Sequence, residues 1–475
     1  MALYGGVGAS ALPSELIVHI FSFLSARDKL RASAVCSRWR ECLFYPALWP
    51  ELKLRLGRGT GGAGTSSDEI PKLEFLMRKF GSFVRELQLE FAPVEGYPVR
   101  WRESLNNYLE QVLCVLRSLK NNRNLQKLSL YGDTCILQEE GILDGTHLTQ
   151  VDQGGKKIKE IKQLFEETLA CSRQLKWLSS AFMLGMVTPN SLSTMSNLSA
   201  NSLEHLSLLD NQAPPLIPSI ELGRLLNLHS LALDFCDFTS EMCQVLSNSD
   251  HMPLHRLSLV LHGTVLHNKP LDITPGEVDW QALVRHSANL RVYIMALDVH
   301  SQDLLSVLKP SLPLERIHFD SYSTCASEAA LDLISRQYCK TLSHFILVRD
   351  LMERDDTGFP DLSDNRNEDP LVLLAWRCTH LSLLIIHGYT VWAHNLIAIS
   401  RLRGSNLKVL AVSEESIDFD QDQLLFQDED PIHNLIEEVS LGLGRPWNPM
   451  MDTNIVLSEP TQHFFREMQR FSEGI

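Results

Sequence analysis

The stretch NLHSLALDFC, residues 227–236, decides how most of this chain folds. Leu228, Leu231 and Leu233 stand at relative positions 0, +3 and +5, and the same apolar spacing recurs along the chain. The twelve copies begin at Phe83, Asn124, Gln174, Ser202, Asn227, Pro253, Asn289, Pro313, Thr341, His380, Asn406 and Leu435. Seven of the eleven intervals between their first apolar residues are 24–29 residues long, a period typical of stacked repeats.

This spacing resembles the Leu-x-x-Leu-x-Leu core of leucine-rich repeats, in which each unit adds one short strand and a returning helix. Helical patterns fill several intervals, at 104–119, 156–169 and 327–338. We therefore expect an irregular α/β solenoid with a curved parallel sheet and outer helices. Its tail, residues 463–471, is expected to cap the back of the stack. An ordinary doubly wound α/β domain would also alternate strands and helices and remains an alternative.

Side chains alternate along a strand, so residues at +3 and +5 point into the core and those at +2, +4 and +6 point to the opposite, open face. We call this open face the floor. Its larger polar residues are candidate substrate-binding residues: Lys127, His205, Arg256, Arg316, His318, Asp320, His344 and His387. Arg256 and Arg316, two units apart, are expected roughly 10 Å from one another, where a phosphorylated or acidic segment could bridge them. Other floor positions are plain, including Val292 and Ile294, and solvated strand surface is the favoured explanation of the polar ones.

The N-terminal segment LPSELIVHIFSFL, residues 12–24, predicts a helix that is apolar almost all round. Pro13 suits the first helical position and Glu15 places a negative charge in the first turn. Such a helix must be covered on two sides, whereas a domain of about 45 residues can cover only one. The segment therefore indicates a docking face for another protein.

This segment and the residues after it resemble the F-box. The pattern Leu-Pro-x-Glu-Leu-x-x-x-Ile-Phe-x-x-Leu is followed by Leu-x-x-x-x-Val-Cys-x-x-Trp and then Leu-Trp. The resemblance implies three helices that bind a Skp adaptor, and through it a cullin and a RING subunit. The predicted adaptor-binding residues are Leu12, Pro13, Ile17, Ile20, Phe21, Leu24, Leu30, Val35, Trp39, Leu48 and Trp49. Eight basic and three acidic residues between 27 and 58 suit an acidic partner, although a solvated helical face would explain them too.

The resulting domain prediction is an F-box at 9–56, a Gly/Ser-rich linker at 57–69 and a repeat domain at 70–475. Acidic insertions interrupt the repeats near 350–370 and 414–430. The chain has 475 residues and a net charge of −15, which argues against a general nucleic-acid binder. No stretch approaches the roughly 20 apolar residues that span a bilayer. We expect an intracellular protein of the cytoplasm, the nucleus or both.

The sequence contains none of the phosphate-binding, serine-hydrolase, metalloprotease or kinase motifs, and its ten cysteines lack metal-site spacing. We expect no catalytic residue, metal or cofactor. The resemblance implies the substrate receptor of a Skp–cullin–F-box ubiquitin ligase, which binds target proteins through its repeats. The nearer alternative is a repeat scaffold that binds Skp without promoting ubiquitination, and an unrecognised hydrolase is a distant one.

Overall fold

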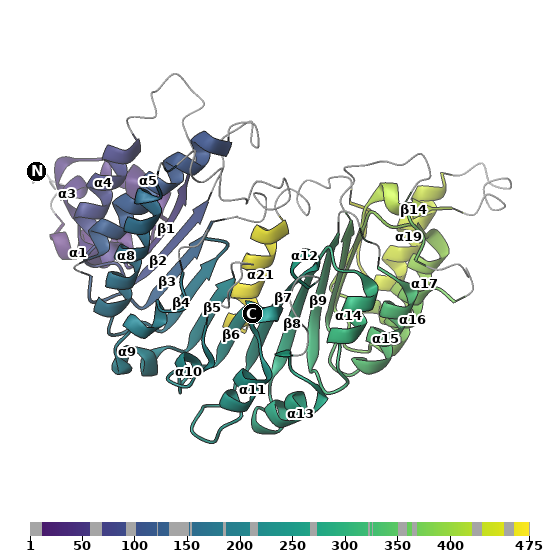
Figure 1. The fold of residues 1–475 in the computed structure, drawn as a ribbon. Helices are drawn as coiled ribbons and strands as arrows, with labels where there is room; N and C mark the ends of the chain where they lie inside the picture. The colour runs from purple at the N-terminus through teal and green to yellow at the C-terminus, as the bar shows by residue number, and fades with distance from the viewer. Residues whose placement is uncertain are drawn as a thin grey trace, which may run out of the picture. The chain divides into compact units, whose positions relative to one another are not determined.

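Eleven of the twelve repeated phrases form strands in the computed structural model (Figure 1). The structure describes residues 12–57, 69–91, 101–120, 122–132, 152, 154–183, 187–209, 217–266, 273–321, 324, 326–349, 359–362, 368–419, 430–450 and 460–474. Most of the predicted linker and of both acidic insertions lies outside these residues. The chain divides into two units, 1–204 and 205–475, so the division falls within the repeats.

Three short helices and a 3-10 turn begin the first unit and confirm the predicted helical domain: α1 (Ser14–Ser22), α2 (Ala26–Ser33), α3 (Ser37–Cys42) and η2 (Pro46–Leu48). The first repeats follow as β1 (Glu51–Leu56), α4 (Glu69–Phe80), β2 (Glu86–Phe91), α5 (Trp101–Leu119), β3 (Lys127–Tyr131), α8 (Lys156–Cys171), β4 (Trp177–Ala181), η4 (Leu192–Thr194) and α9 (Asn197–Ser202). The strands pair in parallel in the order β1-β2-β3-β4. Strand β1 is an additional strand that precedes the first repeated phrase.

The second unit continues the same arrangement with β5 (His205–Leu209), α10 (Ser219–Leu222), β6 (Ser230–Asp234), η5 (Phe235–Asp237), α11 (Ser240–Leu246), β7 (Arg256–His262), α12 (Gly263–Leu266), α13 (Glu277–His286), β8 (Arg291–Leu297), α14 (Ser301–Val307) and β9 (Leu314–Ser321). Its later elements are α15 (Glu328–Gln337), β10 (His344–Arg349), α16 (Pro370–Arg377), β11 (Leu383–His387), β12 (Val391–Trp392), α17 (Ala393–Arg403), η7 (Gly404–Asn406), β13 (Val409–Val412), η8 (Glu414–Ser416), β14 (Ile417–Asp418), α19 (Pro431–Leu443) and α21 (Pro460–Glu473). Strands β5 to β11 and then β13 pair in parallel in sequence order, and β12 pairs with β14.

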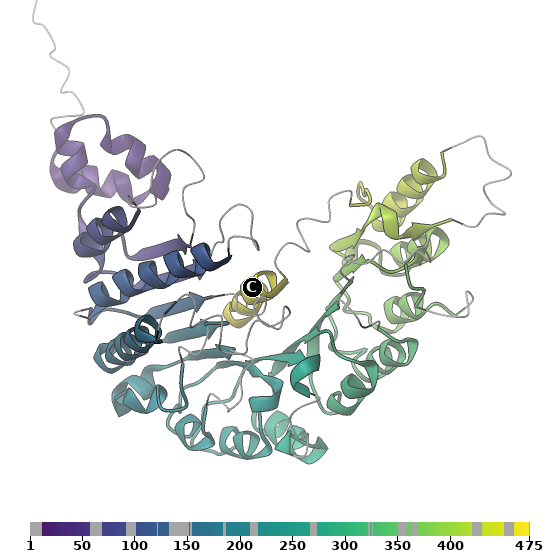
Figure 2. The same cartoon turned by 45° about the horizontal axis from the view of Figure 1, so that its top comes forward.

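Sequential strand order within each unit excludes the doubly wound alternative, in which the order reverses at a switch point. The inward positions form ladders of apolar residues across neighbouring strands. Leu206, Leu231, Leu257 and Val292 stand in register on β5 to β8, and each side chain is fully buried. The leucine-rich-repeat architecture is therefore confirmed, with an open parallel sheet and outer helices (Figures 1 and 2).

The structure corrects two details of the repeat prediction. The copy at Leu435 is helical and belongs to α19, because the Asp430 side chain caps its N-terminus and its buried residues recur every four positions. In β8, Val292 and Ile294 pair with Leu257 and Leu259, so they point into the core while Tyr293 and Met295 lie on the floor. The segment between the first apolar residue of the repeated phrase and the strand is one residue shorter before β8 than before β7. A shift of one residue moves every side chain of a strand to the opposite face of the sheet.

The back of the stack is capped by residues 444–450 and not, as predicted, by the tail. Trp447 donates its indole N–H to the Leu410 carbonyl at 2.8 Å, and Met450 donates its amide to Val412 at the same distance. These contacts cover the edge of β13, where unpaired backbone groups would otherwise be open to other chains. The tail forms α21, which lies on the floor of the second unit (Figure 2). Among the described residues, no helix combines the length and apolar character needed to cross a bilayer.

Candidate functional site

The predicted floor residues do not form one open polar surface. Four of them, His205, His318, Asp320 and His387, are almost completely buried, at 1–4 % exposed. His318 and Asp320 face each other as a buried pair 3.8 Å apart. In the first unit, the Lys127 ammonium lies 4.2 Å from the centre of the Trp177 ring. A substrate that approaches the floor therefore meets few of the nominated groups.

Arg256 and Arg316 lie on β7 and β9 as predicted, but both are already engaged by α21. Their guanidinium carbons lie 5.2 and 5.0 Å from the centre of the Phe471 ring. Arg256 also donates from Nε to the Phe471 carbonyl at 3.2 Å. The predicted bridge between these arginines is thus occupied by an aromatic side chain of the same chain, and a phosphate would have to displace it.

His344 is the remaining floor candidate and gives an acid-sensitive contribution to stability. Burial, followed by the charges of Arg316 and Lys408, lowers its pKa to about 4. The imidazole of the unfolded chain is protonated below about pH 6.5, whereas that of the folded chain stays neutral until about pH 4. The contribution of neutral His344 to the free energy of unfolding is therefore fully present above about pH 6.5 and is lost as the pH falls toward 4. We expect the free energy of unfolding of wild type to fall about 2 kcal/mol further than that of His344→Gln between pH 7 and pH 5. Urea unfolding of both proteins at the two pH values measures this, and equal losses would contradict it.

The N-terminal helical domain has a small core of its own. Ile17, Phe21, Cys42, Leu43 and Leu48 form it and are 0–7 % exposed. Leu12, Val18, Leu24, Ala32, Trp39 and Trp49 are half-buried against this cluster. The core therefore uses seven of the eleven residues predicted to bind the adaptor: Leu12, Ile17, Phe21, Leu24, Trp39, Leu48 and Trp49.

Ile17, Phe21 and Leu48 are buried and support the domain from inside. Leu12, Leu24, Trp39 and Trp49 keep part of their surface exposed, so the adaptor-binding role of these four stays a prediction. Phe21 contacts Trp39 edge to face at 5.5 Å between ring centres. Trp49 donates its indole N–H to the Leu43 carbonyl at 2.7 Å and packs on Phe80 of α4 at 5.3 Å. The core fixes α1 against α3, and Trp49 joins the helical domain to the first repeat.

A separate apolar face of the domain remains exposed. Leu16 is 49 % exposed, Ile20 40 %, Phe23 77 %, Leu30 55 % and Val35 66 %. In α1 and the turn after it, residues 16, 20 and 23 follow the i, i+4, i+7 spacing of one helical stripe, and residues 17, 21 and 24 follow the stripe beside it. We call Leu16, Ile20, Phe23, Leu30 and Val35 the docking face.

The prediction included Ile20, Leu30 and Val35 of the docking face, and also the exposed Pro13, but it missed Leu16 and Phe23. The helical spacing alone divides the apolar residues of α1 and the turn after it into two stripes, one through Leu16, Ile20 and Phe23 and one through Ile17, Phe21 and Leu24. A helix that is apolar all round gives no indication of which stripe meets its own domain. The position of α3 decides this, since it packs against Ile17 and Phe21.

Comparison with known proteins agrees with this geometry. Residues 9–55 match the F-box-like family model. The whole chain is 62 % identical to human "F-box only protein 33" and covers 90 % of it, and it is 59 % identical to the mouse protein of the same name, covering 89 %. The chain belongs to the F-box protein family. Mouse "F-box/LRR-repeat protein 21" is 23 % identical over 92 % of the chain and covers 88 % of that relative.

F-box proteins are typically adaptors of ubiquitin ligases and not their catalytic subunits, and an F-box implies binding to a Skp adaptor. In this F-box protein, the docking face holds five exposed large apolar side chains, and Phe44 and Tyr45 after α3 are exposed as well. A solvent-exposed apolar run of this kind marks a site of protein interaction. The docking face is therefore the candidate functional site.

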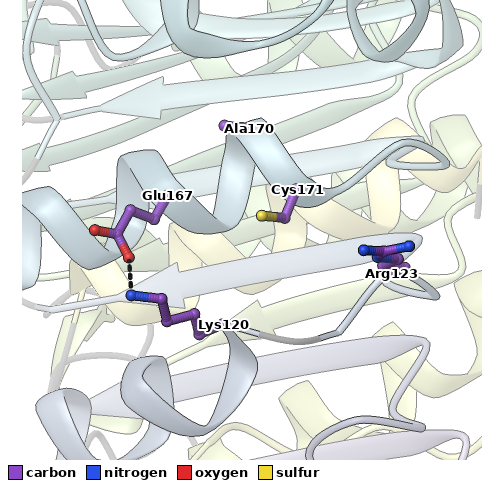
Figure 3. A pocket seen from close by; sticks show the side chains of 5 residues that line it. All are labelled: Lys120, Arg123, Glu167, Ala170 and Cys171. Atoms are coloured by element: carbon purple, nitrogen blue, oxygen red, sulfur yellow. Dashed lines mark ion pairs between the residues drawn. The ribbon is translucent and has the colours of Figure 1, made fainter.

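A pocket of about 590 Å³ lies in the first unit, at the C-terminal ends of α5 and α8 (Figure 3). Its lining residues are Lys120, Arg123, Glu167, Ala170 and Cys171. Lys120 and Glu167 form an ion pair of 3.1 Å across it. Hydrogen bonds from Gln163 and Lys120 lower the pKa of Glu167, so this carboxylate stays charged and neutralises Lys120. The pocket has mixed charge, and we place the candidate site elsewhere.

Proposed function

We propose that this F-box protein is a substrate-recognition subunit of a Skp–cullin–F-box ubiquitin ligase. The observation that carries the proposal is the docking face, which is exposed while the F-box core beneath it is complete without it. Burial of each of these side chains by a partner is worth roughly 1.5–3 kcal/mol, enough in sum for micromolar binding after association costs. The partner is the Skp adaptor, which connects the chain to the cullin and RING subunits.

The repeats then act by positioning. A protein held on the repeat domain is brought close to a ubiquitin thioester carried by another subunit, which raises the effective concentration of its lysines. No residue of this chain takes part in the chemistry under this proposal. A scaffold that binds Skp without promoting ubiquitination is the alternative, and only the receptor accelerates turnover of a bound protein.

The test is binding of purified Skp to the full chain and to a triple variant of the docking face, Leu16→Ala, Phe23→Ala and Val35→Ala. We expect the variant to bind at least 100-fold more weakly, about 2.7 kcal/mol, with unchanged thermal unfolding. The matched control replaces Leu198, Ile220 and Val278 by alanine, because these apolar residues outside the F-box are 76–78 % exposed. Equal binding by the triple variant and wild type would contradict the proposed docking face.

A second readout separates receptor from scaffold. Tagged wild type and the triple variant are purified from cells with the proteasome inhibited, and cullin and repeat-bound proteins are quantified. For a receptor, the triple variant loses Skp and cullin while its repeat-bound proteins remain and accumulate. The turnover of the same repeat-bound proteins is then measured without the inhibitor, and equal turnover with the two chains would favour the scaffold.

A further inference from the structure

The C-terminal helix α21 lies against the floor of the second unit (Figure 2). Phe464, Phe465, Met468 and Phe471 are fully buried and follow the i, i+1, i+4, i+7 spacing of a helical stripe. On the other side of the helix, the Arg470 side chain is 64 % exposed and pairs with Glu467. The helix is thus amphipathic and meets the sheet through aromatic side chains.

The floor of β5 to β8 carries small buried residues beside larger apolar ones such as Val260 and Met295. Ser207, Ser230 and Ser258 are buried on β5, β6 and β7, and the Ser207 hydroxyl lies 3.7 Å from the Met468 sulfur. Small side chains let a helix approach the strands closely. Tyr293 on β8 then supplies edge-to-face contacts to Phe464 and Phe471, with ring centres 5.1 and 5.7 Å apart.

The two arginines recognise the C-terminal end of the helix. Arg256 donates to the carbonyl of Phe471 in the last turn, where the helix dipole is negative and the same oxygen also accepts from the Gly474 amide at 3.1 Å. Arg316 reaches the same ring from β9. A cation at this place fixes the direction in which a helix lies on the floor.

Removal of α21 would leave the apolar core between the strands and the outer helices of the repeats buried. The apolar ladders of β5 to β8 point away from the floor, and side chains on the two faces of a strand are independent. Of the groups that α21 covers, the hydroxyl and guanidinium groups hydrate readily once uncovered, whereas the Tyr293 ring does not. The contact of α21 with the sheet therefore has the character of a helix bound in a groove.

From these contacts we infer that the floor of β5 to β9 is a binding site for an amphipathic aromatic helix of another protein, and that α21 occupies this site in the absence of that partner. The partner helix carries aromatic or methionine side chains at i, i+1, i+4 and i+7 and ends over Arg256 and Arg316. Ubiquitination of the captured partner rests on the proposed function, whereas binding of the helix does not.

The test uses a fluorescent peptide of residues 460–475 as the probe and the full chain as the receptor. Phe464→Ala with Phe471→Ala weakens the internal helix and leaves the floor intact. We expect the peptide to bind this variant at least tenfold more tightly than wild type, and Tyr293→Ala added to the variant to reverse the gain. Arg470→Ala is the matched control on the exposed side of α21 and should bind as wild type does. A folded double variant that binds the peptide no better than wild type would overturn the inference.

Hydrogen exchange on wild type decides the question even if the double variant does not fold. With excess unlabelled peptide, amides of residues 464–471 should exchange faster while those of β6 to β8 remain protected. Exchange of α21 and these strands as one unit would show that the helix is an integral part of the domain, and the inference would fail. The assay contains no adaptor, and the triple variant of the docking face should bind as wild type does, so failure here is distinct from failure of the proposed function.

Discussion

Replacement of Phe21 by alanine should destabilise the F-box by about 3–5 kcal/mol, enough to unfold a helical domain of this size. Phe21 is fully buried at the centre of the F-box core and contacts the Trp39 ring. Loss of the ring leaves a cavity that α1 and α3 cannot close without moving. The measurement is hydrogen exchange with mass spectrometry, in which residues 12–48 should lose protection while β6 to β8 keep theirs.

Phe23 provides the matched control because it is the same residue type two positions away in the chain. Its side chain is 77 % exposed and contacts the His19 ring at 4.9 Å. Phe23→Ala should change the free energy of unfolding by no more than about 0.5 kcal/mol. It should nevertheless weaken Skp binding about tenfold, as expected for a large apolar anchor. If Phe23→Ala destabilised the F-box as much as Phe21→Ala, the division between core and docking face would be wrong.

These two phenylalanines also show what the N-terminal sequence could and could not predict. The motif, the three helices and the need for a partner follow from the residues of α1 to α3. The distinction between the Phe21 stripe and the Phe23 stripe does not, because both are apolar and only the packing of α3 and η2 selects one. A triple substitution at Leu12, Pro13 and Phe21 would for this reason test folding as much as binding.

The repeat region was predictable where the period-two pattern is strong. The ladders through Leu231 and Leu257 lie as the spacing indicates. The pattern fails in β8, where Tyr293 and not Val292 faces the floor. The residues of this strand are apolar in succession, so their sequence does not show that the segment before the strand is one residue shorter. It fails again in α19, whose residues satisfy both the strand and the helix spacing, and where the Asp430 cap decides the outcome.

The position of α21 illustrates a different limit. The sequence predicts only that the apolar tail, residues 463–471, caps the back of the stack, and the structure makes it part of helix α21. Its packing partner is Tyr293 and the serines of β5 to β7, about 170–260 residues earlier. No local pattern encodes such a contact. Sequence reasoning therefore nominated Arg256 and Arg316 as open ligands without the helix that covers them.

Asn122→Ala should lower the free energy of unfolding by about 3 kcal/mol, because the amide group serves two buried carbonyls and one partly buried backbone amide at once. Asn122 is 1 % exposed and donates from Nδ2 to the carbonyls of Gly81 and Val84, each at 2.7 Å. Its Oδ1 accepts from the Asn124 amide at the same distance. Alanine cannot replace any of these bonds, and water has little access to the groups that are left.

The asparagine thus ties the turn before β3 to the turn before β2 and so joins two successive repeats. Asn124→Ala is the matched control, since that side chain is exposed and reaches only the Ser82 carbonyl, at 3.3 Å. It should change stability by no more than about 0.5 kcal/mol. Urea unfolding of both variants followed by circular dichroism makes the comparison. Equal, small losses would mean that the apolar ladders alone hold these repeats in register, whereas a large loss confined to Asn122→Ala assigns that role to the buried amide.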